Sequence, residues 1–226
     1  MGRRPASNRP KRQTLTRDRV LRTALDLADE RGIDSLTMRE LGQRLGVDAM
    51  SLYNHVDNKD DLLNSIVDLV VTEIDLPTGE DDWAEAMRIR ARSARQAFAR
   101  HPWASQLVDS RTSSGPARLR YLEWVLGTLR GAGFSIDESL HAFSALDSHV
   151  YGFARQQFNM SASDAGSPDA AEALLSEIPT DEFPNLTEVV TQYMQGGGYD
   201  PDADFEFGLS LILDSLHRLL DAPPHG

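Results

Sequence analysis

Residues 36–56 read Leu36-Thr-Met-Arg-Glu-Leu-Gly-Gln-Arg-Leu-Gly-Val-Asp-Ala-Met-Ser-Leu-Tyr-Asn-His-Val56. In its first half, leucines recur at near-helical spacing, and the glycine-valine pair that follows interrupts the pattern. The segment therefore predicts a short helix over about 37–45 that ends in a sharp turn at Gly46. The leucines expected to hold this helix against a core are Leu36, Leu41 and Leu45.

A second short helix is expected directly after the turn. Asp48 is a suitable N-cap for it, and Leu52 and Val56 would then point inward. Two helices joined so tightly form a helix-turn-helix, and in DNA-binding versions the second helix enters the major groove. An ordinary pair of packed helices has the same pattern. The residues left on or beside the outward face are Ala49, Met50, Ser51, Tyr53, Asn54 and His55.

The neighbouring segments predict helices on both sides of this motif. A first helix is expected to begin at the N-cap Thr16 and to end at Gly32. A fourth helix, over about 59–74, has an apolar surface too broad for one partner. We therefore expect the fourth helix to pack on the helix-turn-helix and also on a second domain, as a mechanical link.

Residues 16–63 resemble the DNA-binding domain of the TetR family of bacterial repressors. The resemblance rests on Leu45-Gly-Val47, on Ser51-Leu-Tyr-Asn-His-Val56 and on Asn58-Lys-Asp-Asp-Leu-Leu63. It covers a whole three-helix unit and the start of a fourth helix. It implies a homodimeric repressor that binds a near-palindromic operator in double-stranded DNA and is released by a small-molecule inducer.

The resemblance also implies which residues meet DNA. Thr37 and Arg39 correspond to positions that contact a phosphate and, in some relatives, a base, and the planar guanidinium of Arg39 matches guanine. Lys59 is expected to anchor on a phosphate. On the outward face of the motif, the serine can donate to bases or phosphates and the asparagine can pair with adenine. Tyr53 and His55 can donate to phosphates. Ala49 and Met50 offer apolar contact.

The formal net charge of −12 is unevenly distributed along the chain. Residues 1–62 hold 12 Lys and Arg against 10 Asp and Glu, which leaves 11 against 25 for the remainder. Because phosphates repel acidic surfaces, the first part is the one expected to meet DNA. Residues 1–14 predict a flexible arm that either contacts the DNA backbone or minor groove or remains a solvated tail. The basic residues of the arm are Arg3, Arg4, Arg9, Lys11 and Arg12.

The remainder of the chain predicts helices throughout, with a mobile loop over the small and polar residues 160–171. Two of the segments, about 135–160 and 202–221, have more apolar residues than one buried stripe requires. This excess indicates an interface between two copies, of the four-helix-bundle type. The other candidate helices are about 82–100, 102–111, 114–131, 168–178 and 182–195.

Gly133-Phe-Ser-Ile-Asp-Glu-Ser-Leu140 resembles part of the tetracycline-repressor subgroup, which implies an inducer pocket in this half of the chain. Tetracycline repressors hold a drug-magnesium chelate with a histidine, a glutamate-bound water and an asparagine. Ungapped placement puts Val108, Gln156 and Arg90 near those positions, so no metal site is expected. The pocket candidates, most of which are equally suited to plain core packing, are Trp103, Leu107, Tyr121, Trp124, Phe143, His149, Phe153 and Gln156.

Composition excludes several other classes of protein. The chain has no cysteine, which excludes disulfides and thiolate chemistry, and no apolar run approaches the roughly 20 residues of a membrane span. No nucleophile or phosphate-loop motif is present. We therefore expect a cytoplasmic, non-enzymatic protein without a cofactor.

The sequence predicts an all-α protein in three parts: a basic arm (1–14), a helix-turn-helix domain with its linking helix (15–75), and a larger helical domain for ligand binding and dimerisation (76–226). Two alternatives remain open at this point. One is an architectural DNA-binding protein that responds to no ligand. The other is an all-helical enzyme or small-molecule carrier whose basic arm is incidental.

Overall fold

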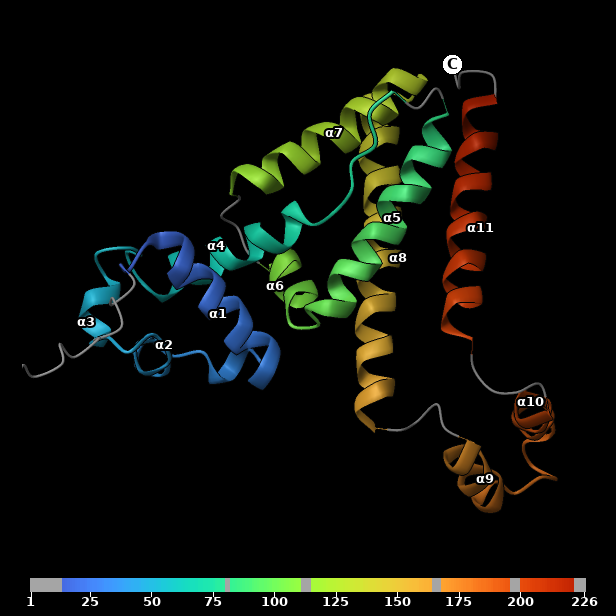
Figure 1. Ribbon diagram of the computed structural model, residues 1–226. Helices are drawn as coiled ribbons and strands as arrows, with labels where there is room; N and C mark the ends of the chain where they lie inside the picture. Colours follow the sequence, from blue (N-terminus) through green and yellow to red (C-terminus); the bar gives the residue numbers. More distant parts are fainter. Residues whose placement is uncertain (1–13, 80–81, 111–114, 164–167, 196–199, 222–226) are drawn as a thin grey trace, which may run out of the picture. The chain divides into compact units, whose positions relative to one another are not determined.

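The computed structural model describes residues 14–79, 82–110, 115–163, 168–195 and 200–221. Every regular element within these ranges is helical, as the sequence predicts (Figure 1). The chain divides into two compact units, an N-terminal unit that ends at Ile66 and a C-terminal unit that begins at Val67. No helix in the described ranges is long and apolar enough to cross a bilayer.

The N-terminal unit is built from capped helices: α1 (Arg17–Arg31), the 3-10 turn η1 (Ile33–Ser35), α2 (Met38–Leu45), α3 (Ala49–Leu52) and the beginning of α4 (Lys59–Thr72). Thr16, Thr37 and Asp48 each accept a hydrogen bond from the first turn of their helix, which confirms Thr16 and Asp48 as the predicted caps. The shared core includes Val20, Leu27, Leu36, Leu41, Leu52, Val56 and Leu62.

The turn of the helix-turn-helix depends on two glycines. Gly46 ends α2 in the left-handed region at φ 69°, where an L side chain is strained. At Gly42, a Cβ would lie 3.1 Å from the Val47 carbonyl oxygen and 3.2 Å from the Ala49 nitrogen. Because both neighbours are backbone, the close approach of α2 to α3 favours glycine at this position, and a larger residue would push the two segments apart by a few tenths of an ångström.

The third helix differs from the expectation, because α3 ends at Leu52 instead of continuing to Val56. The amides of Tyr53 and His55 donate to the carbonyls three residues earlier, Met50 and Leu52, at 3.3 and 2.8 Å. This tighter pattern is common at helix ends. Tyr53, Asn54 and His55 consequently lie in a turn that follows one turn of helix.

In the C-terminal unit, α8 (Ile136–Ser163) packs against four other helices (Figure 1). These helices are α5 (Trp83–Arg100), α6 (Ala104–Ser110), α7 (Pro116–Ala132) and α11 (Pro201–Asp221). Buried residues of α11 recur at helical spacing, which gives this helix one inward stripe. The stripe consists of Phe205, Leu209, Leu213 and Leu216.

Helices α9 (Pro168–Glu177) and α10 (Pro184–Gln195) pack on each other. The mobile loop expected over 160–171 is contradicted at both ends, because residues 160–163 belong to α8 and residues 168–171 to α9. The other predicted helices of this unit agree with the observed helices to within about two residues at each end.

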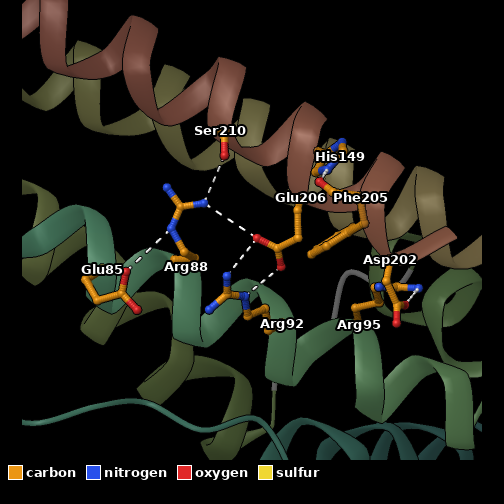
Figure 2. A network of polar contacts seen from close by, with 9 residues as sticks. All are labelled: Glu85, Arg88, Arg92, Arg95, His149, Asp202, Phe205, Glu206 and Ser210. Atoms are coloured by element: carbon orange, nitrogen blue, oxygen red, sulfur yellow. Dashed lines mark hydrogen bonds and ion pairs between the residues drawn. The ribbon is translucent and has the colours of Figure 1, made fainter. Parts of the chain in front are cut away.

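Arginines of α5 face acidic residues of α11 in a ladder of ion pairs (Figure 2). Arg92 holds Glu206 with two hydrogen bonds, Nε to Oε1 at 2.6 Å and Nη2 to Oε2 at 2.8 Å. Arg95 pairs with Asp202 at 2.7 Å, and its guanidinium lies over the Phe205 ring, 4.9 Å from the ring centroid. The ladder therefore helps to position α11 on α5.

Acid is expected to weaken this ladder. The hydrogen bonds from Arg92 lower the pKa of Glu206 in the folded protein, so Glu206 stabilises the fold above the ordinary carboxyl pKa and loses this contribution as the pH falls through the lowered value. Glu206→Gln should cost less than about 1 kcal/mol near neutral pH, because the pair is partly exposed. Its thermal midpoint should then fall less than that of the wild type between about pH 6 and pH 3. Parallel losses in both proteins would contradict this expectation, and Glu123→Gln on the exposed side of α7 is the control.

Candidate functional site

The turn after α3 is held in place by one arginine of α1. Arg17 Nη1 donates to the main-chain carbonyl of His55, while Nη2 donates to Asp61 Oδ1 at 3.2 Å and to Ser65 Oγ at 2.8 Å. The hydrogen bond from Arg17 lowers the pKa of Asp61, which therefore remains charged at neutral pH. Asp61 also accepts from the Asp57 amide at 3.0 Å. Helices α1 and α4 thus fix the backbone of this turn.

Residues of α3 and of the turn after it form a partly exposed surface. Met50 is 72% exposed and Tyr53 is 45% exposed, although both are large and partly apolar. Asn54 is exposed, and Ser51 and His55 are half-buried beside it. An exposed surface of this kind, on a backbone fixed from behind, is suited to contact a partner. Ala49 lies half-buried at the start of α3.

The remaining predicted DNA contacts lie near this surface in the sequence. Thr37 uses its oxygen to accept from the Glu40 amide at 3.1 Å, which leaves its hydroxyl proton available to a phosphate. Arg39 on α2 and Lys59 at the start of α4 are both exposed. The basic arm, with Arg3, Arg4, Arg9, Lys11 and Arg12, lies outside the described residues. The DNA-contacting role of all these residues remains a prediction.

A cavity of about 150 Å³ lies within the C-terminal unit. Its lining comes from the end of α4 and from α5, α6, α7 and α8. A neighbouring hollow of about 240 Å³ shares Ser148 and Tyr151 with it. The residues that line the cavity are Val71, Ile74, Phe98, Val108, Arg118, Tyr121, Leu122, Phe143, Ser144, Asp147, Ser148 and Tyr151.

A buried polar network forms one wall of this cavity. Asp147 Oδ1 accepts from Arg90 Nη1 at 2.6 Å and from the Tyr121 hydroxyl at 2.9 Å, and Oδ2 accepts from the Tyr151 hydroxyl at 2.9 Å. Arg90 also donates to the Tyr121 oxygen. Its side chain is fully buried, and its Nε and Nη2 have no partner among the described residues. Such a charge persists in a protein interior because a carboxylate compensates it.

The network has a fixed protonation pattern. Burial raises the pKa of Tyr121 and of Tyr151 above the ordinary tyrosine value, so both hydroxyls keep their protons at physiological pH. Burial alone would lower the pKa of Arg90, but the neighbouring Tyr121 and Asp147 raise it. The arginine therefore keeps its charge.

The eight predicted pocket residues lie in several different parts of the C-terminal unit. Tyr121 and Phe143 lie on the cavity. His149 and Phe153 instead face α11, where His149 Nε2 lies 3.0 Å from the Phe205 carbonyl and the Phe153 ring packs edge-on against the Phe205 ring.

The other four predicted residues also lie away from the cavity lining. Trp124 borders a separate hollow and donates from Nε1 to the Pro77 carbonyl at 3.0 Å. Trp103 is buried beside His101, Leu107 is half-buried on α6, and Gln156 is exposed on α8. Any ligand-binding role for these four residues stays a prediction.

Asp147 and Tyr151 line the cavity but were not among the predicted pocket residues. One signal was available, because Asp147 is an acidic residue on a broadly apolar helix with no Lys or Arg within four positions. A buried carboxylate needs a partner from elsewhere in the fold. The described residues contain no group of three or more His, Asp or Glu side chains able to hold a metal ion.

Helix α4 contributes Val71 to the cavity lining, and Asp68 of the same helix makes a second contact with the cavity wall. The Asp68 carboxylate accepts from the amides of Ala117 and Arg118, at 3.1 and 3.0 Å, and so caps the N-terminus of α7. A Cβ on Gly115 would lie 2.4 Å from the Asp68 carboxylate, so this close approach requires glycine. Since Arg118 lines the cavity, α4 and the cavity wall share one hydrogen-bonded junction.

Two family models match the chain. Residues 20–66 match the bacterial regulatory proteins of the tetR family, and residues 76–220 match the tetracyclin repressor-like C-terminal domain. The chain is 34% identical to the HTH-type transcriptional repressor DrrR1 of Streptomyces coeruleorubidus, over 97% of this chain and 83% of that protein. It is 31% identical to the class A tetracycline repressor of transposon 1721 in Escherichia coli, over 88% of this chain and 89% of that protein.

Solved structures agree with these relatives. The TetR family protein ActR of Streptomyces coelicolor, in complex with actinorhodin, has a TM-score of 0.79 and 32% identity, over 92% of this chain and all of that one. A tetracycline-repressor variant from Acinetobacter baumannii, in complex with minocycline, has a TM-score of 0.66 and 26% identity, over 92% of this chain and all of that one. Matched along nearly its whole length, the chain belongs to the TetR family of bacterial transcriptional regulators.

Proposed function

We propose that the chain is a homodimeric, ligand-responsive repressor that releases its operator when a small molecule occupies the cavity of the C-terminal unit. The course of α4 is the observation that supports this most directly. Near its start, Asp61 helps to fix the turn after α3, and near its end, Val71 lines the cavity. A ligand that displaces the end of α4 would therefore move a helix that begins beneath the DNA-contacting turn.

We assign DNA recognition to Ser51 on α3 and to Tyr53, Asn54 and His55 in the turn after α3. Thr37, Arg39 and Lys59 would contact phosphates or bases beside it, and Ala49 and Met50 would contribute apolar contacts. In a dimer, two such surfaces about one helical turn of DNA apart would read successive major grooves. A ligand that changes the separation of the two surfaces would abolish operator binding, because they could no longer enter successive major grooves together. We assign residues 15–75 to the DNA-binding domain and residues 76–226 to ligand binding and dimerisation.

A second copy of the chain fits the outer faces of α8 and α11. These faces expose large apolar side chains in addition to the buried stripes, which a helix with one partner does not require. Pairing them across a two-fold axis would bury this surface in a four-helix bundle. The exposed residues are Ile136, Leu140 and Phe158 on α8, and Phe207, Leu211 and Leu219 on α11.

The ligand is proposed to be a small organic molecule and not a drug-magnesium chelate. Relatives crystallised with actinorhodin and with minocycline support a ligand-binding role for this half of the chain. Near the positions where ungapped placement puts the tetracycline repressor's chelate-holding residues, however, Val108 is an apolar part of the cavity wall, Arg90 is buried in an ion pair, and Gln156 is exposed. Valine and arginine supply no metal ligand, and the amide oxygen of Gln156 lies on the exposed surface of α8. The homologous regulators have a non-enzymatic role, and we infer a cytoplasmic protein without catalytic activity.

Selection from a random duplex pool at about physiological salt tests this function. The purified protein should enrich an inverted repeat, and the mass of the complex should correspond to two chains on one duplex. A long footprint without sequence preference would instead support a ligand-independent architectural protein. If no motif is enriched, the selection is repeated on refolded protein freed of bound ligand, and a second failure would contradict the proposal.

A further inference from the structure

The turn after α3, residues 53–56, has little local structure to hold it in place. Helix α3 has only four residues, and a single helical turn is unstable without outside contacts. The amides of Tyr53 and Asn54 donate to carbonyls three residues earlier at 3.3 and 3.4 Å, which is longer than usual for such bonds. Contacts from other helices therefore set the position of the side chains in this turn.

Arg17, the His55 carbonyl, Asp61 and Ser65 form a closed network, which we call the Arg17 clamp. Arg17 Nη1 donates to the His55 carbonyl and, at 3.3 Å, to Asp61 Oδ2. Nη2 donates to Asp61 Oδ1 at 3.2 Å and to Ser65 Oγ at 2.8 Å. The four N–H groups of the two terminal nitrogens are thus all directed at acceptors within the clamp. A phosphate could reach only Nε–H without breaking this network.

Asp61 is engaged to the same extent. Its two oxygens accept from Arg17, from the Asp57 amide at 3.0 Å and from the Ser65 hydroxyl at 3.4 Å. These bonds use the roughly four lone-pair positions of a carboxylate. The Asp61 amide donates in turn to Asn58 Oδ1 at 2.8 Å, which caps the start of α4. One carboxylate therefore joins α1, α4 and the chain that leaves the turn.

We propose that Arg17 and Asp61 are positioning residues for operator recognition, which act by holding the turn after α3 and not by contacting DNA. This role rests on the proposed function, because it requires the turn to recognise DNA. A turn ordered in advance loses less conformational entropy when its side chains meet base edges. Non-specific binding depends mainly on charge. The clamp should therefore affect binding to the operator and leave binding to other duplexes unchanged.

A second ion pair in the same unit supplies matched controls. Arg31 and Glu40 join α1 to α2, and their side chains are 53% and 33% exposed, close to the 49% and 28% of Arg17 and Asp61. The variants Arg17→Gln, Asp61→Asn, Arg31→Gln and Glu40→Gln are prepared in the full chain. Fluorescence anisotropy then gives the affinity of each for the operator selected by the wild type and for a scrambled duplex at the same salt concentration.

Asp61→Asn is the most informative variant, because charge and position predict opposite results. Removing an acidic charge reduces repulsion of phosphates, so charge alone predicts tighter binding to both duplexes, as expected for Glu40→Gln. The clamp predicts an operator affinity about three- to tenfold lower, the effect of one net hydrogen bond, with the scrambled duplex bound at least as tightly as by the wild type. Tighter operator binding by Asp61→Asn, as in Glu40→Gln, would overturn the proposal.

Variants of Arg17 separate the clamp from a direct phosphate contact. Arg17→Lys keeps the charge, but one ammonium cannot reproduce the fork that serves the His55 carbonyl and Asp61 together. Arg17→Lys and Arg17→Gln should both lower the ratio of operator affinity to scrambled-duplex affinity. The salt dependence of operator binding should be the same in Arg17→Gln as in Arg31→Gln. Full recovery in Arg17→Lys, or a smaller salt dependence in Arg17→Gln, would identify a phosphate contact instead.

Hydrogen exchange without DNA separates this role from the repressor function. Exchange over residues 53–57 should be faster in Arg17→Gln than in Arg31→Gln, whereas the thermal midpoints should be similar because both ion pairs are partly exposed. Equal exchange in the two variants would overturn the clamp. If the wild type selects no operator but exchange differs as expected, the repressor function is refuted and the hold of the clamp on the turn stands. If the wild type selects an operator that all clamp variants bind at the wild-type ratio, the positioning role is refuted and the repressor function stands.

Discussion

Replacing both Tyr53 and His55 with alanine is expected to lower operator affinity at least about a hundredfold and to leave the dimer intact. Each side chain is proposed to donate to a charged phosphate, and such a hydrogen bond contributes about 1.5–3 kcal/mol. Losing both therefore costs about 3 kcal/mol or more, and each 1.4 kcal/mol corresponds to a factor of ten in affinity. Operator affinity is measured by fluorescence anisotropy, and the oligomeric state by light scattering.

The fold of the DNA-binding unit should survive this double substitution. Tyr53 is 45% exposed, and Arg17 holds the turn through the main-chain carbonyl of His55, which alanine retains. Gln43→Ala on the exposed surface of α2 is the control and should bind normally. Loss of phosphate contacts should also reduce the dependence of affinity on salt. If the double variant binds as tightly as the wild type with an unchanged salt dependence, the assignment of this turn to DNA recognition is wrong.

The local features of the fold were predictable because their causes lie within a few residues. Asp48 caps α3 through an amide two residues away, and Gly46 ends α2 in a conformation that favours glycine over other residues. Helix boundaries in the C-terminal unit also have local causes, since Pro116 begins α7 and Gly133 ends it. The shortness of α3 was not predictable, because the turn after it is held by Arg17, which is 38 residues away from His55.

The cavity was less predictable, because helical periodicity does not say which partner covers each face of a helix. Tyr121 and Phe143 face the cavity, whereas His149 and Phe153, on the same broadly apolar helix α8 as Phe143, face α11. Both orientations produce the same apolar spacing in the sequence. The pairing of Arg90 with Asp147 joins residues separated by 57 positions, so it depends on how α5 packs against α8.

The buried pair of Arg90 and Asp147 is expected to be strongly coupled. Asp147→Leu alone leaves a fully buried guanidinium without its counter-charge and should reduce the free energy of unfolding by about 3–5 kcal/mol. Arg90→Met alone should cost less, because the hydroxyls of Tyr121 and Tyr151 still donate to the carboxylate. Urea unfolding measures both losses, and an unchanged slope would indicate that the extent of unfolding is the same.

The double substitution Arg90→Met with Asp147→Leu separates coupling from packing. It removes both charges together, so no uncompensated ion remains, and apolar side chains of similar volume often replace a buried ion pair without loss. We expect the double variant to be more stable than Asp147→Leu alone, although it differs from the wild type at one more position. If the two single losses instead simply add, the carboxylate does not compensate the arginine.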